Sequence, residues 1–161
     1  MNGLKKITMV LLVIIGSTLT FSCSKDDEKV EEPKLTPSQI LSSISWETTN
    51  AKDNQGNDVV LTNLNVSNFV GFAYFKTNGT FTMYNLDNSP KMHGDWSVSA
   101  DGKKRTIVAK NDAGVVLFTR VVDITVLTKE EFTYRIYPNN NDKTIYFDII
   151  HTPTTHKEPQ K

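Results

Sequence analysis

Short β-prone segments separated by turn residues run through most of the chain and leave few folds open to it. From Trp46 onward these segments are rich in Val, Ile, Thr, Phe and Tyr, and Gly, Asn and Asp interrupt them at fairly regular spacing. Each connection is too short for a crossover helix, so neighbouring strands are expected to run antiparallel. We expect strands near residues 46–51, 58–62, 69–76, 80–86, 92–98, 105–110, 115–126, 131–137 and 144–151.

The number and spacing of these strands favour a barrel or a sandwich. A closed up-and-down barrel has the advantage that no edge strand is left unpaired. Alternation supports one buried face, since Phe132, Tyr134 and Ile136 point to the same side of their strand. The segment 69–75 is apolar on both faces, so we expect it to be covered on both, with the N-terminal helix as the candidate cover.

A short helix is expected just before the first strand. Thr36 is a candidate N-cap, Pro37 suits the first helical position, and Gln39 completes a capping box. The predicted fold class is therefore all-β: a small antiparallel up-and-down β-barrel of about 8–9 strands with a short N-terminal helix.

The N-terminus has the pattern of a processing signal. Lys5 and Lys6 precede an apolar run over residues 7–21, which is short for a membrane-spanning helix and ends at Ser22 and Cys23. This pattern resembles a bacterial lipoprotein signal, in which the cysteine is acylated and becomes the new N-terminus. Cys23 is thus the predicted lipidation site, and the predicted partner of the chain is a membrane, reached through that lipid anchor.

The four residues after the cysteine form a second candidate signal. Ser24, Lys25, Asp26 and Asp27 resemble the export signal of surface lipoproteins in Bacteroidota-type bacteria, and a merely solvated spacer is the alternative. We therefore expect an outer-membrane lipoprotein exposed at the cell surface. The predicted organisation is a signal peptide at 1–22, a flexible charged tether at 23–34, a barrel at 35–153 and a solvated polar tail at 154–161.

Charge and cysteine content exclude several classes of protein. The 161 residues carry a formal net charge of zero with a pI near 6.8, so a surface that tracks nucleic-acid phosphates is not expected. A single cysteine rules out an internal disulfide within the chain and any cysteine-rich metal site.

Four short motifs occur together in an order that resembles a known group. They are Trp46 on the first strand, the turn at residues 78–81, Gly94 to Trp96, and the late element at residues 127–132. Over residues 41–153 the chain resembles an uncharacterised lipocalin-like domain family of bacterial lipoproteins. The resemblance implies a small antiparallel barrel with a helix at one end, and it implies no assigned activity.

No motif for catalysis or cofactor binding is found. The chain has neither a nucleophile elbow nor a glycine-rich phosphate loop. His93 and Asp95 share one strand face, but the histidines are few and scattered, and the adjacent Glu130 and Glu131 point to opposite faces of a strand. We therefore expect no catalytic residue, no metal, no cofactor and no enzymatic activity.

Aromatic side chains are the only residues gathered in sufficient number to form a binding site, and two interpretations of them remain open. They either fill the barrel or line a cavity of a few hundred cubic ångströms for a small apolar ligand. A filled barrel would suit an interaction or structural protein of the cell envelope, which would expose an apolar patch on its outer surface. The candidate residues for that patch are Val70, Tyr137 and Tyr146. The candidate cavity or core residues are Trp46, Phe72, Tyr74, Tyr84, Trp96, Phe132 and Tyr134.

Two further expectations concern the barrel. One of Arg105, Arg120 and Arg135 is expected to cover a barrel end by stacking on Trp46. The protein is expected to be a monomer, because a closed barrel leaves no edge strand free for pairing.

Overall fold

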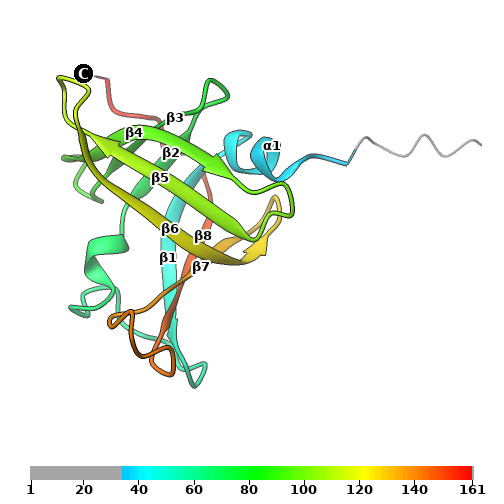
Figure 1. The fold of residues 1–161 in the computed structure, drawn as a ribbon, viewed down its shortest axis with the longest axis vertical. Helices are drawn as coiled ribbons and strands as arrows, with labels where there is room; N and C mark the ends of the chain where they lie inside the picture. Colours follow the sequence, from blue (N-terminus) through cyan, green and yellow to red (C-terminus); the bar gives the residue numbers. More distant parts are fainter. Residues whose placement is uncertain (1–33, 161) are drawn as a thin grey trace, which may run out of the picture. The chain divides into compact units, whose positions relative to one another are not determined.

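The computed structural model describes residues 34–160, so the predicted signal peptide, Cys23 and Ser24 to Asp27 lie outside the described residues. Eight antiparallel strands close into a barrel in chain order (Figure 1). The strands are β1 (Ser45–Asp53), β2 (Phe72–Phe75), β3 (Thr80–Tyr84), β4 (Pro90–Val98), β5 (Lys104–Lys110), β6 (Val116–Leu127), β7 (Phe132–Ile136) and β8 (Phe147–Thr154). The predicted fold class is confirmed.

The barrel closes because β1 pairs with both β2 and β8. Trp46 lies opposite Ala73 on β2 and opposite Pro153 on β8. Closure pairs the first and last strands, so no strand edge is left for another chain to extend. Within residues 34–160, no helix is long and apolar enough to cross a membrane.

The helix α1 (Pro37–Ser42) covers one end of the barrel. Its capping box is present: the Gln39 amide donates to the Thr36 hydroxyl, and the Gln39 side chain accepts from the Thr36 amide at 2.8 Å. The helix contacts β2, β4 and β6, which are not adjacent to one another, so it lies across the opening. The Trp46 indole donates to the Leu41 carbonyl at 3.0 Å, which ties the buried first strand to the helix.

One predicted strand is wrong. Residues 58–62 form a single bridge, between Lys52 and Asp58, and then continue as turns into the 3-10 helix η1 (Ser67–Phe69). The composition of residues 58–62 favours a strand, but beyond that bridge no neighbouring strand in the described residues pairs with them. Val59 and Leu61 instead pack against the core from an irregular segment. The connection between β1 and β2 is therefore long, and it places η1 near the barrel opening opposite α1.

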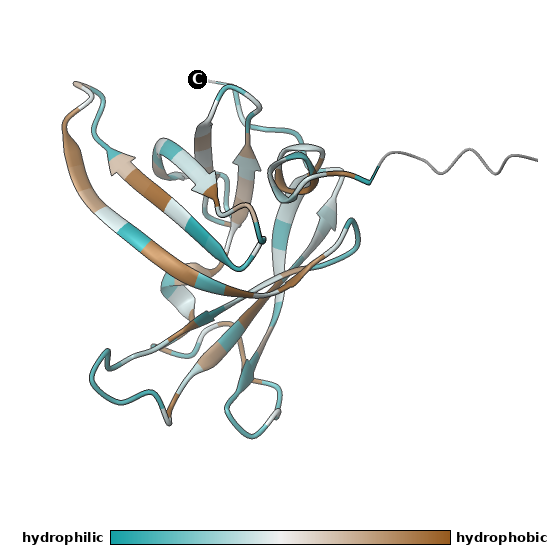
Figure 2. Cartoon of the chain, turned by 45° about the vertical axis from the view of Figure 1, so that its right-hand side comes forward, coloured by the Kyte–Doolittle hydropathy of each residue, from teal (hydrophilic) through white to brown (hydrophobic). Residues whose placement is uncertain are grey.

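The C-terminal tail also differs from the prediction. His156, Glu158 and Pro159 are half-buried rather than solvated, because they pack on the outer side of β2 and β3. Figure 2 shows the hydropathy along the ribbon, with apolar residues on β6 as well as in the interior strands.

Candidate ligand-binding site

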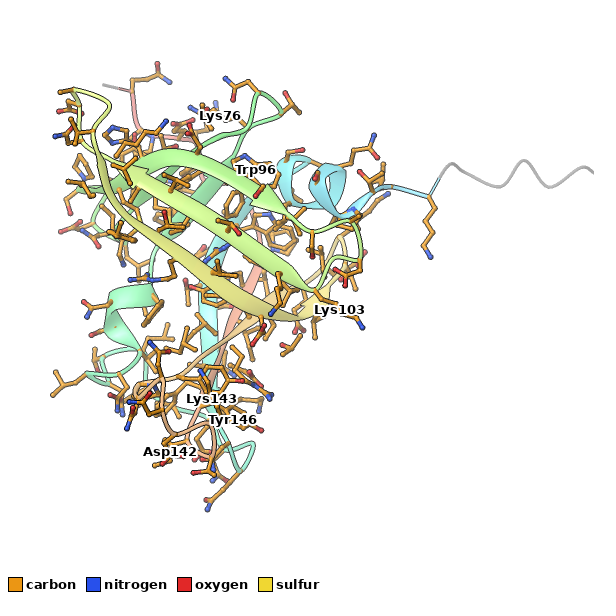
Figure 3. The ribbon with its side chains drawn as sticks, in the orientation of Figure 1. Lys76, Trp96, Lys103, Asp142, Lys143 and Tyr146 are labelled. Atoms are coloured by element: carbon orange, nitrogen blue, oxygen red, sulfur yellow. The ribbon has the colours of Figure 1, made fainter. Side chains whose placement is uncertain are left out.

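Large apolar side chains fill the half of the barrel nearest α1. The ring of Phe132 lies 5.8 Å from that of Trp46 and 6.1 Å from that of Phe75, and Phe75 lies 5.1 Å from Trp96. Four of the predicted cavity or core residues, Trp46, Trp96, Phe132 and Tyr134, belong to this interior cluster. Figure 3 shows Trp96 at the end of the barrel near α1, far from Tyr146 in the β7–β8 connection.

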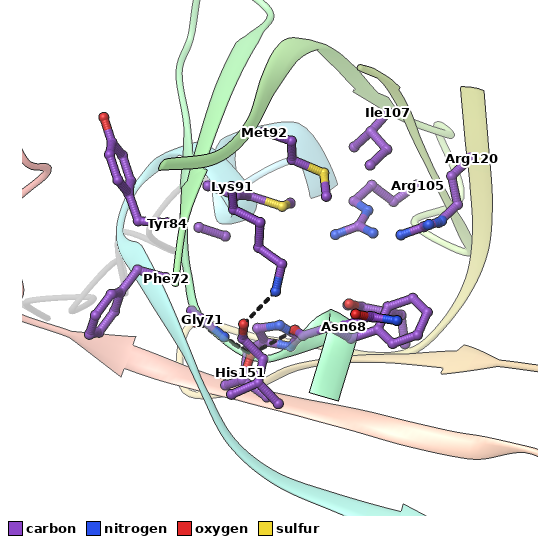
Figure 4. A pocket seen from close by; sticks show the side chains of 16 residues that line it. Asn68, Gly71, Phe72, Tyr84, Lys91, Met92, Arg105, Ile107, Arg120 and His151 are labelled. Atoms are coloured by element: carbon purple, nitrogen blue, oxygen red, sulfur yellow. Dashed lines mark hydrogen bonds between the residues drawn. The ribbon is translucent and has the colours of Figure 1, made fainter. Parts of the chain in front are cut away.

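The other three predicted residues lie elsewhere. Phe72, Tyr74 and Tyr84 form a separate buried cluster, and Figure 4 shows Phe72 and Tyr84 pointing away from the interior. The tail covers them: His156 stacks on Phe72 with ring centroids 3.9 Å apart. The second apolar face of the 69–75 segment is therefore covered by the C-terminal tail rather than by the N-terminal helix.

A small cavity remains between the filled half and η1, and we call it the mouth cavity. Its cavity volume is about 20 Å³, room for about one water molecule, and all the empty space in the hollow, open solvent included, is about 370 Å³. Of the two interpretations that the sequence left open, the structure favours the filled barrel, because this volume falls well short of a few hundred cubic ångströms. The cavity is lined by Thr48, Asn68, Phe69, Val70, Gly71, Phe72, Ala73, Met83, Tyr84, Lys91, Met92, Arg105, Ile107, Arg120, Tyr134 and His151.

Arg105 is the most unusual residue in this lining. Its side chain on β5 points inward, in phase with Ile107 and Ala109, and only 2% of its surface is exposed. The guanidinium lies 4.5 Å from the centroid of the Tyr134 ring, and its Nε and Nη1 have no hydrogen-bond partner in the part of the chain that the structure describes. A buried charged donor without a partner carries a large desolvation cost.

Two more cations face the same space (Figure 4). Arg120 on β6 lies over the ring of Phe69, 5.0 Å from its centroid. Lys91 on β4 is half-buried and donates to the Val70 carbonyl at 2.6 Å. Burial lowers the pKa of Arg105 and of Lys91, and the charge of Arg120 lowers both pKa values further, so the three cations repel one another.

No carboxylate offsets these charges. The sixteen residues that line the mouth cavity include no Asp or Glu, and none of the ion pairs found between residues 34 and 160 involves Arg105, Arg120 or Lys91. Arg135 shows the contrast, because its guanidinium is held on the outer surface by both oxygens of Asp148, each at 2.8 Å.

The neighbouring titratable groups are neutral. Burial, followed by the charge of Arg105, lowers the pKa of His151 to about 3, so its imidazole is uncharged at neutral pH and its Nδ1 lies 3.1 Å from the Phe132 carbonyl. Burial raises the pKa of the Tyr134 hydroxyl, which therefore stays protonated. The lining thus offers several donors, a positive charge and apolar walls to an oxyanion.

Lys91 is the residue that sequence reasoning missed. Strict alternation from Met92 and Gly94 would put Lys91 on the outer face of β4. The pairing of β3 with β4 shifts by one residue between Met83 and Tyr84, and this bulge leaves Lys91 without a register partner and turns it inward. The inward orientation of Arg105 could have been predicted, because it lies two residues before Ile107 and so on the same face of the strand. The bulge that turns Lys91 inward has no clear signal in the sequence.

The predicted stacking of an arginine on Trp46 is wrong. Arg105 lies over Phe75, Phe132 and Tyr134, Arg120 over Phe69 and Phe118, and Arg135 over Tyr146. The indole of Trp46 is instead covered by α1.

The scattered histidines do not converge on a metal site. His93 points outward, where its Nε2 lies 3.7 Å from Asp112, while His151 points into the barrel. Between residues 34 and 160 no three His, Cys, Asp or Glu side chains come together as metal ligands would.

Comparison with known proteins assigns the chain to a family. Residues 38–161 match the domain of unknown function DUF4822. The chain belongs to the DUF4822 family. A search of curated proteins gives no match. Among solved structures, the DUF4822 chain is similar to a lipocalin-like protein from Bacteroides uniformis, with 13% identity and a TM-score of 0.48, over 71% of this chain and 99% of that one.

Proposed function

We propose that the barrel binds a small anionic ligand at its mouth cavity, with the oxyanion of the ligand on Arg105. The observation that carries this proposal is the buried guanidinium with two unpartnered nitrogens in a lining without carboxylates. Nε and Nη1 point to different sides of the guanidinium, and each can donate a charge-assisted hydrogen bond to an oxygen of a carboxylate or a phosphate.

The ligand class differs from the one that the sequence predicted. A wholly apolar ligand would need a cleft or cavity of roughly 300 Å³ or more, and the volume of the mouth cavity is about 20 Å³. An anionic head group needs little room, and it would offset the mutual repulsion of Arg105, Arg120 and Lys91. The body of the ligand would then lie toward the open part of the hollow.

Calorimetric titration tests this proposal. The chain from Ser24 onward contains every core residue of the barrel, and acetate, phenylacetate and inorganic phosphate serve as probes. We expect at least one probe to bind the wild type and to lose about tenfold or more in affinity in Arg105→Met. Lys104→Met is the matched control, because it removes one positive charge from the adjacent, exposed position of β5. Equal affinities in the two variants, or no binding by any probe, would contradict the proposal.

We further propose that this binding module is a non-enzymatic monomer anchored at Cys23 and carried to the surface of the outer membrane. Support comes from the apolar run at residues 7–21, the cysteine that follows it, and Ser24 to Asp27 after that. Two or three acyl chains hold a protein on a bilayer stably, whereas a single chain does not.

The outer surface of β6 supports a second candidate, an envelope protein that acts through protein contacts. Four apolar side chains in and next to β6 are each more than half exposed: Val115, Val116, Leu117 and Val121. The main exposed apolar surface therefore lies on β6 and not at Val70, Tyr137 and Tyr146, where the sequence placed it. A photo-crosslinker at Val121 should then capture an envelope protein that the same group at Thr152, on the outer face of β8, does not. Equal capture at both positions would contradict this candidate.

A further inference from the structure

Phe69 occupies the part of the mouth cavity nearest to the solvent. Its ring packs edge-on against Tyr134, with centroids 6.4 Å apart, and the Arg120 guanidinium lies 5.0 Å from its centroid. The side chain is only half-buried, although it lies inside the barrel opening. It therefore fills the part of the mouth cavity between Arg120 and Tyr134 without being part of the fully buried core.

The segment that carries Phe69 is held by the buried Val66, by partly buried side chains on the core, and by hydrogen bonds to its backbone. The Thr48 hydroxyl lies 3.1 Å from the Phe69 carbonyl and 3.2 Å from the Gly71 amide, and Lys91 holds the Val70 carbonyl. The 3-10 helix η1 belongs to the long connection between β1 and β2, which pairs with β1 through the bridge at Asp58 and through the Gly71 carbonyl, which accepts from the Thr48 amide. Long connections of this kind next to a cavity commonly serve as lids.

The filled half of the barrel restricts the body of any ligand. Below Arg105 the interior is packed with the rings of Phe75 and Phe132, so a long acyl chain cannot extend toward α1. A ligand whose head group reaches Arg105 must therefore place its body where Phe69 now lies, or leave that body in the solvent.

We propose that the ligand is a monocarboxylate carrying one aromatic ring, and that this ring takes the place of Phe69 between Arg120 and Tyr134. This inference rests on the proposed function, since it needs the carboxylate on Arg105. An aromatic body fits because Arg120 already lies over the face of a ring there, and Tyr134 already meets its edge. Phe69 acts as an internal plug, which the ligand displaces by moving η1.

Removal of the plug tests the inference by calorimetric titration of phenylacetate, cyclohexylacetate and acetate. We expect Phe69→Ala to bind phenylacetate about tenfold more tightly than the wild type, because the ligand no longer has to displace a side chain. The affinity for acetate should stay the same, since acetate has no ring to place. Cyclohexylacetate should gain less than phenylacetate, because it lacks the π face that Arg120 meets.

The matched control is Phe118→Ala. Phe118 also lies against Arg120, 5.1 Å from its guanidinium, but it is not part of the mouth cavity lining. The inference that Phe69 blocks the ligand site is contradicted if Phe69→Ala leaves the affinity for phenylacetate unchanged. It is also contradicted if Phe118→Ala raises that affinity equally. If acetate still depends on Arg105 in that case, the proposed function stands and only the inference fails. If no probe binds the wild type, both fail together.

Discussion

At the scale of single residues, Arg105 sets the balance between stability and binding. A buried ion is costly, and replacing one with an apolar side chain of similar length is often neutral or stabilising. The structure gives Arg105 ring faces but no hydrogen-bond partner for Nε and Nη1 within residues 34–160. A protein that keeps such a residue gives up stability, and a binding function for the unpartnered donors explains why the residue is kept.

Arg105→Met should therefore stabilise the ligand-free protein. We expect the free energy of unfolding to rise by about 1 kcal/mol, because the desolvated charge is removed and the methionine still packs on Tyr134. Urea unfolding monitored by tryptophan fluorescence measures this change. A loss of more than about 2 kcal/mol would mean that the guanidinium is a structural part of the core, and would weigh against a binding role.

The buried His151 should make the barrel sensitive to acid. Its pKa is ordinarily 6.5 and is lowered to about 3 in the fold, so between these values the unfolded chain binds a proton that the folded chain does not. Stability therefore falls as the pH drops from 6.5 toward 3, by up to about 1.4 kcal/mol per pH unit from this group. Unfolding of the wild type and of His151→Gln at several pH values measures it, and parallel profiles for the two proteins would refute this assignment.

At the scale of elements, local chemistry predicted some parts well and missed others. The α1 capping box could be recognised from Thr36 and Gln39, because its partners are three residues apart. The false strand at 58–62 and the inward Lys91 depend on which segments become neighbours in the barrel, and the sequence pattern does not contain that information. The packing of the C-terminal tail could not be predicted for the same reason, because its contact partners lie on β2 and β3, far away in the sequence.

The tail should contribute measurably to stability through His156. Burial, followed by the charge of Glu158, raises the pKa of the Tyr74 hydroxyl to about 12, so at neutral pH it is a donor to His156 Nδ1, 2.6 Å away. Loss of this bond and of the stacking on Phe72 should lower the free energy of unfolding by about 1 kcal/mol in His156→Ala. Thr155→Ala, next to it with an exposed side chain, is the control, and equal effects of the two substitutions would contradict a packed tail.

At the scale of the whole molecule, closure of the barrel could be predicted because alternation, turn residues and short connections all agree. The volume left inside could not, because it depends on how rings from different strands meet: Trp46 on β1, Phe75 on β2 and Phe132 on β7. The candidate site lies in the small space that these rings leave, and a bulge in β4 completes it.

The proposed location of the molecule has its own test. In the native host, an alkyne analogue of palmitate should label the wild type and should not label Cys23→Ser, because the acylated thiol is then absent. Replacing Lys25, Asp26 and Asp27 with alanine should leave the labelling intact and should reduce digestion by protease added to whole cells. Labelling of Cys23→Ser, or unchanged digestion of the triple variant, would contradict the anchor or the export signal, respectively.

The anion proposal is tested most directly by a high-resolution crystal structure of the protein purified from its native host. The account predicts density for an anion with an oxygen within hydrogen-bonding distance of Arg105 Nε or Nη1, and loss of that density in Arg105→Met. Density for water molecules alone at these two nitrogens, or a carboxylate of the same chain in their place, would contradict the proposal.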